Sequence, residues 1–166
     1  MSNSREAAAS DTILFYEVLL EDKPVFVLEL KPPQDLRYDS TRGGADRHIR
    51  RRLQDLRGWL SLTFFFGIVL ITFNNIAECP LPVIYGVSAM GTRLCFYKKH
   101  RDEPIEPPFI PAHPELQTNA APQERWDRDI LDDEGERRFL SIVEEIKQAC
   151  AVLVLLPEAC RVLVSY

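Results

Sequence analysis

Residues 25–31 alternate between two faces of a predicted strand, and the rest of the chain can be arranged around this stretch. Successive side chains of a strand point to opposite faces. Phe26, Leu28 and Leu30 therefore form an apolar face suited to a core, whereas Glu29 and Lys31 emerge side by side on the other face. A carboxylate and an ammonium at the end of an apolar strand are costly unless they pair or serve a site. The alternative is an edge strand whose last residues are solvated.

The residues around this strand predict a hairpin. Most of residues 11–20 are branched or aromatic, which indicates a first strand. The polar residues 21–24 predict the turn that joins the two strands. Prolines 32–33 end the second strand because proline cannot donate to a ladder, and the polar residues down to the glycines at 43–44 predict a loop.

A helical pattern follows over residues 45–57, with Ile49, Leu53 and Leu56 on one stripe. The other faces of this predicted helix hold the strongest local positive charge of the chain, from Arg47, His48, Arg50, Arg51, Arg52 and Arg57. Such a surface is either a solvated charged face or one that faces an anion, and both interpretations stay open.

A second hairpin is predicted over residues 82–99, with strands at 83–88 and 93–98. Gly91 lies between them and is free to take a positive φ. The closely spaced prolines from 104 to 122 indicate an extended loop.

The last predicted element is a helix over residues 134–149, whose acidic start suits the positive end of the helix dipole. The fold class is therefore α/β (α+β), with a mixed central sheet of two hairpins flanked by helices. We expect one domain over residues 11–150, a frayed N-terminus over 1–10 and an apolar C-terminal tail over 151–166.

Residues 59–77 form a long apolar stretch without charge, interrupted by Gly67 and diluted by polar residues. A membrane-spanning helix needs about 20 such residues, so the stretch is near that limit. Its aromatic and branched residues suit a buried strand equally well. A single-pass membrane protein, with the arginines that precede the stretch on the cytoplasmic side, is thus one alternative. Such a span would place the two hairpins on opposite sides of a bilayer.

Composition limits the function classes. The 166 residues have a formal charge of −5, so the protein as a whole is not a basic nucleic-acid binder, and such a role needs a local patch. The four cysteines lie far apart without a metal-binding spacing, which argues against zinc and favours a reducing intracellular compartment, cytoplasm or nucleus. Residues 1–10 do not have the pattern of a secretory signal.

Several short motifs occur in an order that resembles the core of the PD-(D/E)XK nuclease superfamily, the restriction-endonuclease-like fold, and in particular uncharacterised fungal proteins that contain such a core. They are Ser10-Asp11, Glu29-Leu-Lys-Pro-Pro33, Cys79-Pro-Leu-Pro82, Tyr85-Gly-Val-Ser88, Gly91-Thr-Arg-Leu-Cys-Phe-Tyr97, Glu134-Gly-Glu-Arg-Arg138 and Val143-Glu-Glu-Ile-Lys147.

The resemblance implies a catalytic site for phosphodiester hydrolysis. Asp11 and Glu29 would hold a divalent cation, usually magnesium, and Lys31 would orient the attacking water. Hard oxygen ligands suit magnesium, which lowers the pKa of its bound water and neutralises charge on the phosphate. His48 or Gln54 would supply the polar helix residue that the superfamily often adds. The two are about 240° apart on a helical wheel, so at most one of them points inward.

The partner implied is nucleic acid of unspecified type, attracted by the basic helix. The residues expected to contact it are Arg47, His48, Arg50, Arg51 and Gln54. The chain departs from the family in three respects: Ser10 stands where the family has a proline, the helix expected before the first strand is not matched, and residues 59–77 look like a foreign insertion. A non-catalytic binding module with the same fold is therefore an open alternative.

The pairing of the first hairpin decides whether Asp11 and Glu29 can share a cation. With the turn centred near residue 22, Asp11 falls opposite roughly residue 33, within a few residues of Glu29. We therefore expect the two carboxyl groups within reach of one cation, with Lys31 on the same face.

Overall fold

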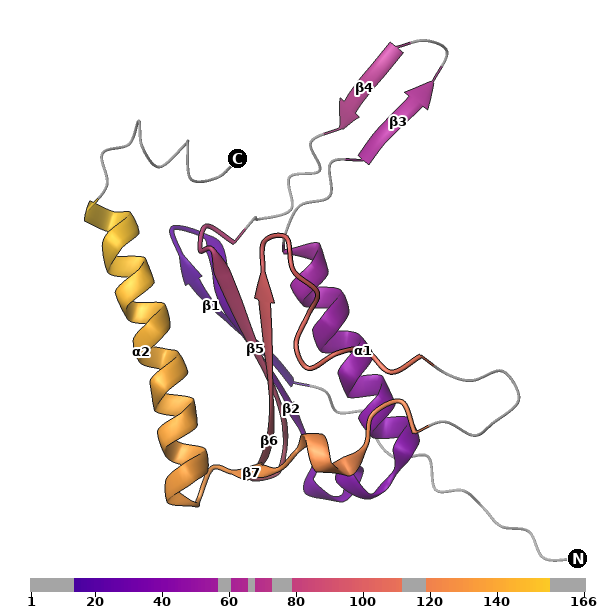
Figure 1. Cartoon of the computed structure of the whole chain (residues 1–166), viewed down its shortest axis with the longest axis vertical. Coiled ribbons are helices and arrows are strands. Elements are labelled where there is room, and N and C mark those ends of the chain that lie inside the picture. The colour runs from indigo at the N-terminus through magenta and orange to yellow at the C-terminus, as the bar shows by residue number, and fades with distance from the viewer. Residues whose placement is uncertain (1–13, 57–60, 66–67, 73–78, 112–118, 156–166) are drawn as a thin grey trace, which may run out of the picture.

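The structure, a computed structural model, describes residues 14–56, 79–111 and 119–155, together with the backbone of 61–65 and 68–72. Its centre is a five-stranded sheet in the order β1-β2-β5-β6-β7 (Figure 1). Within this sheet β2 and β5 are parallel and all other neighbours are antiparallel. The strands are β1 (Leu14–Leu20), β2 (Lys23–Lys31), β5 (Val83–Met90), β6 (Arg93–His100) and β7 (Arg128–Asp129). The predicted mixed sheet of two hairpins is thus confirmed, and β7 is an addition to it.

The first hairpin closes through a two-residue turn. Glu21 and Asp22 have φ angles of 50° and 63°, and positive φ at both central residues is the mark of a type I′ turn. Lys23 and Pro24 already pair with β1, so the turn is shorter than the predicted one. In the resulting register Phe15 lies directly opposite Glu29.

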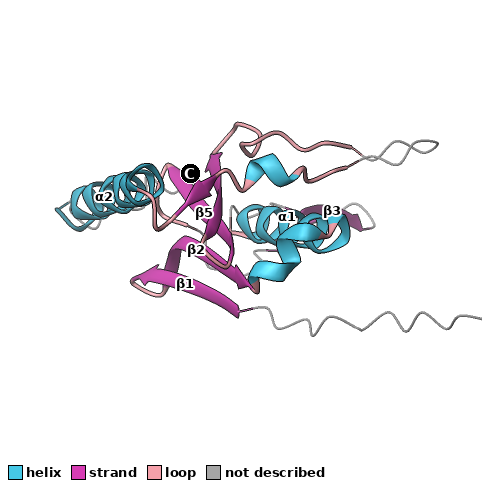
Figure 2. Ribbon diagram, turned by 90° about the horizontal axis from the view of Figure 1, so that it is seen from below, coloured by secondary structure: helices cyan, strands magenta, loops and turns pink. Residues whose placement is uncertain are grey.

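Two helices cover the sheet from opposite sides, α1 (Asp39–Asp55) on one face and α2 (Asp133–Leu155) on the other (Figures 1 and 2). On the α2 side the rings of Phe26 and Phe139 meet edge to face, with centroids 6.3 Å apart. On the α1 side Leu53 packs so closely over β5 that a Cβ on Gly86 would lie 3.3 Å from it. β2 is therefore an interior strand buried on both faces, and the solvated-edge alternative is wrong.

Helix α1 begins six residues before the predicted start at residue 45, so the loop expected down to Gly43 and Gly44 is wrong. Glycine disfavours a helix interior by only about 1 kcal/mol. Arg42 offsets this cost, since its buried guanidinium donates to the carbonyls of Leu36 and Ala121 and pairs with Asp39. Tertiary contacts thus extend the helix through the glycines.

The second hairpin turns at Gly91, whose φ of +62° agrees with the prediction. A Cβ at this position would lie 2.6 Å from Cβ of Pro33, so both conformation and space require glycine. The described parts of the proline-rich loop are irregular, apart from the pairing of Lys98 with Glu106 and the 3₁₀ turn Gln123–Arg125. This agrees with the extended loop that was predicted.

A buried ionic cluster holds this loop on α1. Asp46 pairs with Arg50 and with Arg125, each at 2.8 Å, and accepts a hydrogen bond from the Tyr97 hydroxyl at 3.0 Å. The second ends of the two guanidiniums donate to carbonyls of the loop, those of Pro107 and Pro108.

The apolar stretch at 59–77 contains β3 (Ser61–Phe65) and β4 (Ile68–Thr72), which pair only with each other (Figure 1). The side chains of this stretch lie outside the described residues. No helix within the described ranges is long and apolar enough to span a membrane. Helix α2 continues to Leu155, beyond the predicted end, and takes up the first residues of the predicted apolar tail.

Candidate functional site

Glu29 and Lys31 lie side by side beneath α1. Both residues are buried, with exposed fractions of 0% for Glu29 and 7% for Lys31. The Lys31 ammonium is 3.9 Å from Oε1 of Glu29, an ion pair too long for a direct hydrogen bond. Strand alternation explains the shared face, and the interior position of β2 explains the burial.

Two further side chains reach Glu29 from other elements. His48 on α1 places Nδ1 at 3.4 Å from Oε1 of Glu29, and nearly half of the His48 side chain is exposed. Ser88 on β5 is the residue paired with Glu29 across the parallel strands and is fully buried. His48 therefore forms the solvent side of the site and Ser88 its floor.

Among the described residues, the second carboxylate oxygen of Glu29, Oε2, has no hydrogen-bond partner, and neither does the Ser88 hydroxyl. Both groups are described and buried, so each lacks the interaction that would offset its desolvation. A cation bound to a buried carboxylate oxygen, or a proton on it, would offset this desolvation.

Burial raises the pKa of the Glu29 carboxyl from 4.5 to about 7. The Lys31 ammonium lowers this pKa, and so does the Ser88 hydroxyl, which lies near the carboxyl but outside hydrogen-bond geometry. Together they offset less than desolvation adds. Glu29 thus ionises near neutrality, and an added cation would favour its charged form.

Asp11, the second predicted cation ligand, lies outside the described residues. The register of the hairpin agrees with the predicted one: Leu14 pairs with Leu30 and Phe15 with Glu29. Within the described ranges no group of three or more His, Cys, Asp or Glu side chains could hold a metal ion. The shared-cation geometry of Asp11 and Glu29 therefore stays a prediction.

Of the two predicted polar helix residues, His48 points towards Glu29, whereas Gln54 is exposed. The other residues predicted to contact nucleic acid also differ in their exposure. Arg47 and Arg51 are exposed on α1, but Arg50 is buried and committed to Asp46. The placement of Arg50 on the exposed basic face is thus wrong, because that side chain anchors the proline-rich loop.

The carboxylate of Glu29 is a ligand of the type that magnesium prefers. Such ions prefer oxygen ligands and keep several waters, so one or two carboxylates suffice to hold them. The orphaned Oε2 supplies one oxygen ligand, and the half-exposed His48 leaves this side of the site next to solvent.

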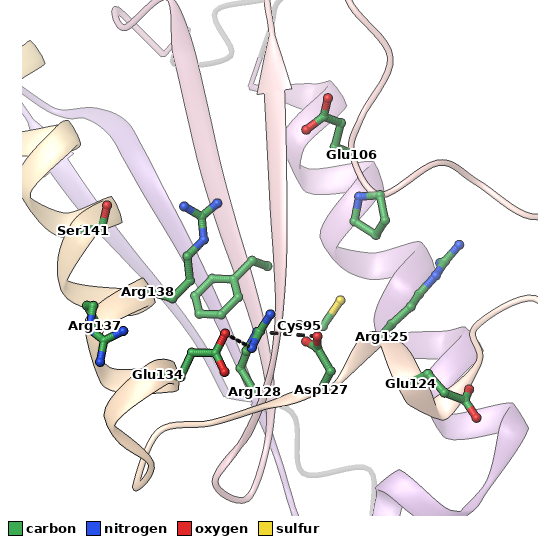
Figure 3. Close-up of a pocket in the computed structure, with 12 residues that line it drawn as sticks. Cys95, Glu106, Glu124, Arg125, Asp127, Arg128, Glu134, Arg137, Arg138 and Ser141 are labelled. Atoms are coloured by element: carbon green, nitrogen blue, oxygen red, sulfur yellow. Dashed lines mark ion pairs between the residues drawn. The ribbon is translucent and has the colours of Figure 1, made fainter.

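A cavity of about 620 Å³ lies between β6 and α2, at the edge of the sheet away from β1 (Figure 3). Arg128 pairs there with Glu134 and Asp127, and Arg125 pairs with Asp46. Burial raises the pKa of Cys95, which also lines it, to about 12, so this thiol is not an activated nucleophile. No residue of the predicted site lines this cavity. The charges of Arg125 and Arg128 are already neutralised by these ion pairs.

Ser88 and Phe15 are neighbours of Glu29 that the sequence-based prediction did not assign to the site. Ser88 is the only serine or threonine in the largely apolar strand β5, which was a usable signal. Its approach to Glu29 depends on the parallel pairing of β2 with β5, which no local pattern encodes.

Comparisons of the chain with protein-family models, with curated proteins and with solved structures found no match.

Proposed function

We propose that the protein is a nuclease-like domain that hydrolyses phosphodiester bonds of nucleic acid with the help of magnesium. The observation that carries this proposal is the fully buried Glu29, whose Oε2 has no partner although an ammonium and an imidazole lie beside Oε1. A carboxylate kept in this state is a strong candidate for a cation ligand. The order and pairing of β1, β2, α1 and β5 are compatible with the restriction-endonuclease-like core.

Each residue then has a role that its position permits. Glu29 contributes a carboxylate oxygen, and Asp11 is the second acidic ligand. Lys31, fixed beside Glu29, holds its charge where it can orient a water or a phosphate oxygen. His48, at the solvent side, is placed to exchange a proton with the leaving group or with solvent. Magnesium, when bound, would lower the pKa of the attacking water and neutralise charge on the phosphate.

The positive charge on α1 supports the same proposal. Arg47 and Arg51 are exposed on the helix that covers Glu29, and phosphate contacts of this kind give sequence-independent, salt-sensitive affinity. The net charge of −5 confines such attraction to this local surface.

The test is a cleavage assay with fluorescent single- and double-stranded DNA and RNA, with and without Mg²⁺. We expect magnesium-dependent cleavage by the wild-type protein and a loss of at least about a hundredfold in Glu29→Gln and in Lys31→Ala. Glu144→Gln is the matched control, since this exposed glutamate on α2 pairs only with side chains of its own helix.

Cleavage that survives in Glu29→Gln, or that is lost equally in Glu144→Gln, contradicts the assignment of the site. A wild-type protein that binds nucleic acid but cleaves none of the four substrates supports instead the non-catalytic binding module.

A further inference from the structure

A second cavity, of about 350 Å³, adjoins the Glu29 site between β1 and α1. Two of its lining residues come from β1 and four from α1: Phe15, Glu17, His48, Arg51, Arg52 and Asp55. Phe15 is the direct partner of Glu29 across the hairpin, and paired residues of antiparallel strands project from the same face. His48 both contacts Glu29 and lines the cavity. The cavity is therefore directly adjacent to the Glu29 site.

The apolar wall of this cavity is an aromatic side chain that the core does not use. Phe15 is 45% exposed, and its ring centroid is 6.5 Å from that of His48, with the rings tilted by 59°. A half-exposed phenylalanine beside an open hollow offers a flat face on which a planar ligand can stack.

The charged residues of the cavity differ in their availability. Arg52 is held by Glu17, with Nη2 at 2.9 Å from Oε2 of that glutamate. Arg51 is exposed and makes no ion pair with a described residue, so its guanidinium can meet an anion from outside. The cavity thus combines one stacking surface with one available cation.

The size of the cavity limits the ligand. Its volume is at the lower end of the range for small-molecule pockets, which suits one nucleoside rather than a stacked base pair. A base inside a duplex is covered on both faces by its neighbours, and only an unpaired, unstacked base can present its face to Phe15.

We propose that this cavity binds one unstacked base of a single-stranded nucleic acid, packed against Phe15, with Arg51 on an adjacent phosphate. The inference rests on the proposed function and specifies its substrate class. The base anchors the strand beside His48, and the next phosphodiester then lies over Glu29 and Lys31. Stacking on Phe15 requires no particular base and no particular sugar, so DNA and RNA are both accepted.

The experiment measures binding without cleavage, by fluorescence anisotropy of labelled oligothymidylate, oligouridylate and a DNA duplex in the presence of a chelator. We expect tighter binding of the single strands than of the duplex, and a loss of about tenfold in Phe15→Ala. Phe15→Trp should retain the affinity. Tyr16→Ala is the matched control, because Tyr16 is 53% exposed on the opposite face of the same strand, and it should change affinity by less than about twofold. An abasic strand should bind the wild-type protein as weakly as the intact strand binds Phe15→Ala.

Equal losses in Phe15→Ala and Tyr16→Ala, a preference for the duplex, or no binding of any strand would overturn the inference. The cleavage assay separates this outcome from failure of the proposed function. Magnesium-dependent cleavage with a KM that Phe15→Ala leaves unchanged rejects the base pocket and retains the nuclease. Selective loss of binding in Phe15→Ala, without cleavage by the wild-type protein, supports the pocket and rejects the nuclease.

Discussion

At the scale of single residues, the carboxylate of Glu29 is buried away from water. Burial raises the pKa of Glu29 to about 7, so between about pH 4.5 and 7 the folded protein binds a proton that the unfolded chain has released. The stability that this proton contributes is fully present below pH 4.5 and is lost as the pH rises through 7. In the metal-free protein, the loss amounts to about 3 kcal/mol as an upper value.

Glu29→Gln should therefore remove much of the pH dependence of folding. The amide is neutral at every pH, so the free energy of unfolding should fall less between pH 5 and pH 8 than in the wild-type protein. Urea unfolding at both pH values in a chelator measures the difference. Equal changes in the two proteins would mean that Glu29 does not titrate in this range.

The sequence predicted the part of the site that lies on one strand. Alternation alone placed Glu29 and Lys31 on one face, and the two side chains indeed form an ion pair. It also allowed one of His48 and Gln54 to point inward, but not the choice between them. Ser88 escaped assignment to the site because it reaches Glu29 through the parallel pairing of β2 with β5, which no local pattern encodes. Phe15 lies opposite Glu29 in the hairpin register that the sequence predicted, but it was not assigned to the site.

At the scale of elements, buried charged side chains of α1 offset the low helix propensity of its first residues. Its start was predicted too late because Gly43 and Gly44 weaken a helix, whereas Arg42 and Asp46 tie the helix to distant carbonyls and to Arg125. Long-range ion pairs of this kind leave no periodic signal in the sequence. The two hairpins, by contrast, were predictable from their apolar runs and turn residues.

Asp46→Ala should destabilise the protein by about 3–5 kcal/mol, because it leaves the buried guanidiniums of Arg50 and Arg125 without their carboxylate. Asp55→Ala, on the same helix, is the control and should cost less than about 1 kcal/mol because its carboxylate is more exposed. Chemical denaturation measures both. Equal effects of the two substitutions would show that the cluster does not hold the loop on α1.

At the scale of the whole molecule, the chain leaves and rejoins the domain at one point. The amide of Cys79 donates to the carbonyl of Leu56 at 2.9 Å, although residues 57–78 separate them. A bond of this type normally closes a four-residue β-turn. Together with the separate pairing of β3 and β4, this supports the interpretation of the segment as an insertion foreign to the domain.

Replacing residues 57–78 by Asn-Gly should therefore preserve the fold, since two residues complete a β-turn between Leu56 and Cys79. We expect an unchanged or higher melting temperature and greater solubility, because a long apolar stretch is removed. Circular dichroism during heating and the soluble yield measure the two effects. A lower melting temperature or yield would show that the segment is an integral part of the domain.

We propose that Glu29 is buried, with one carboxylate oxygen unpaired, because it binds a divalent cation. The most direct test of this proposal is a titration of the protein with Mn²⁺ as a paramagnetic substitute for Mg²⁺, with free Mn²⁺ followed by electron paramagnetic resonance at pH 8. We expect one Mn²⁺ site in the wild-type protein, from which Mg²⁺ displaces the Mn²⁺. The affinity of this site should fall at least tenfold in Glu29→Gln and stay unchanged in Glu144→Gln. No binding to the wild-type protein, or equal binding to the wild-type protein and Glu29→Gln, would contradict the proposal.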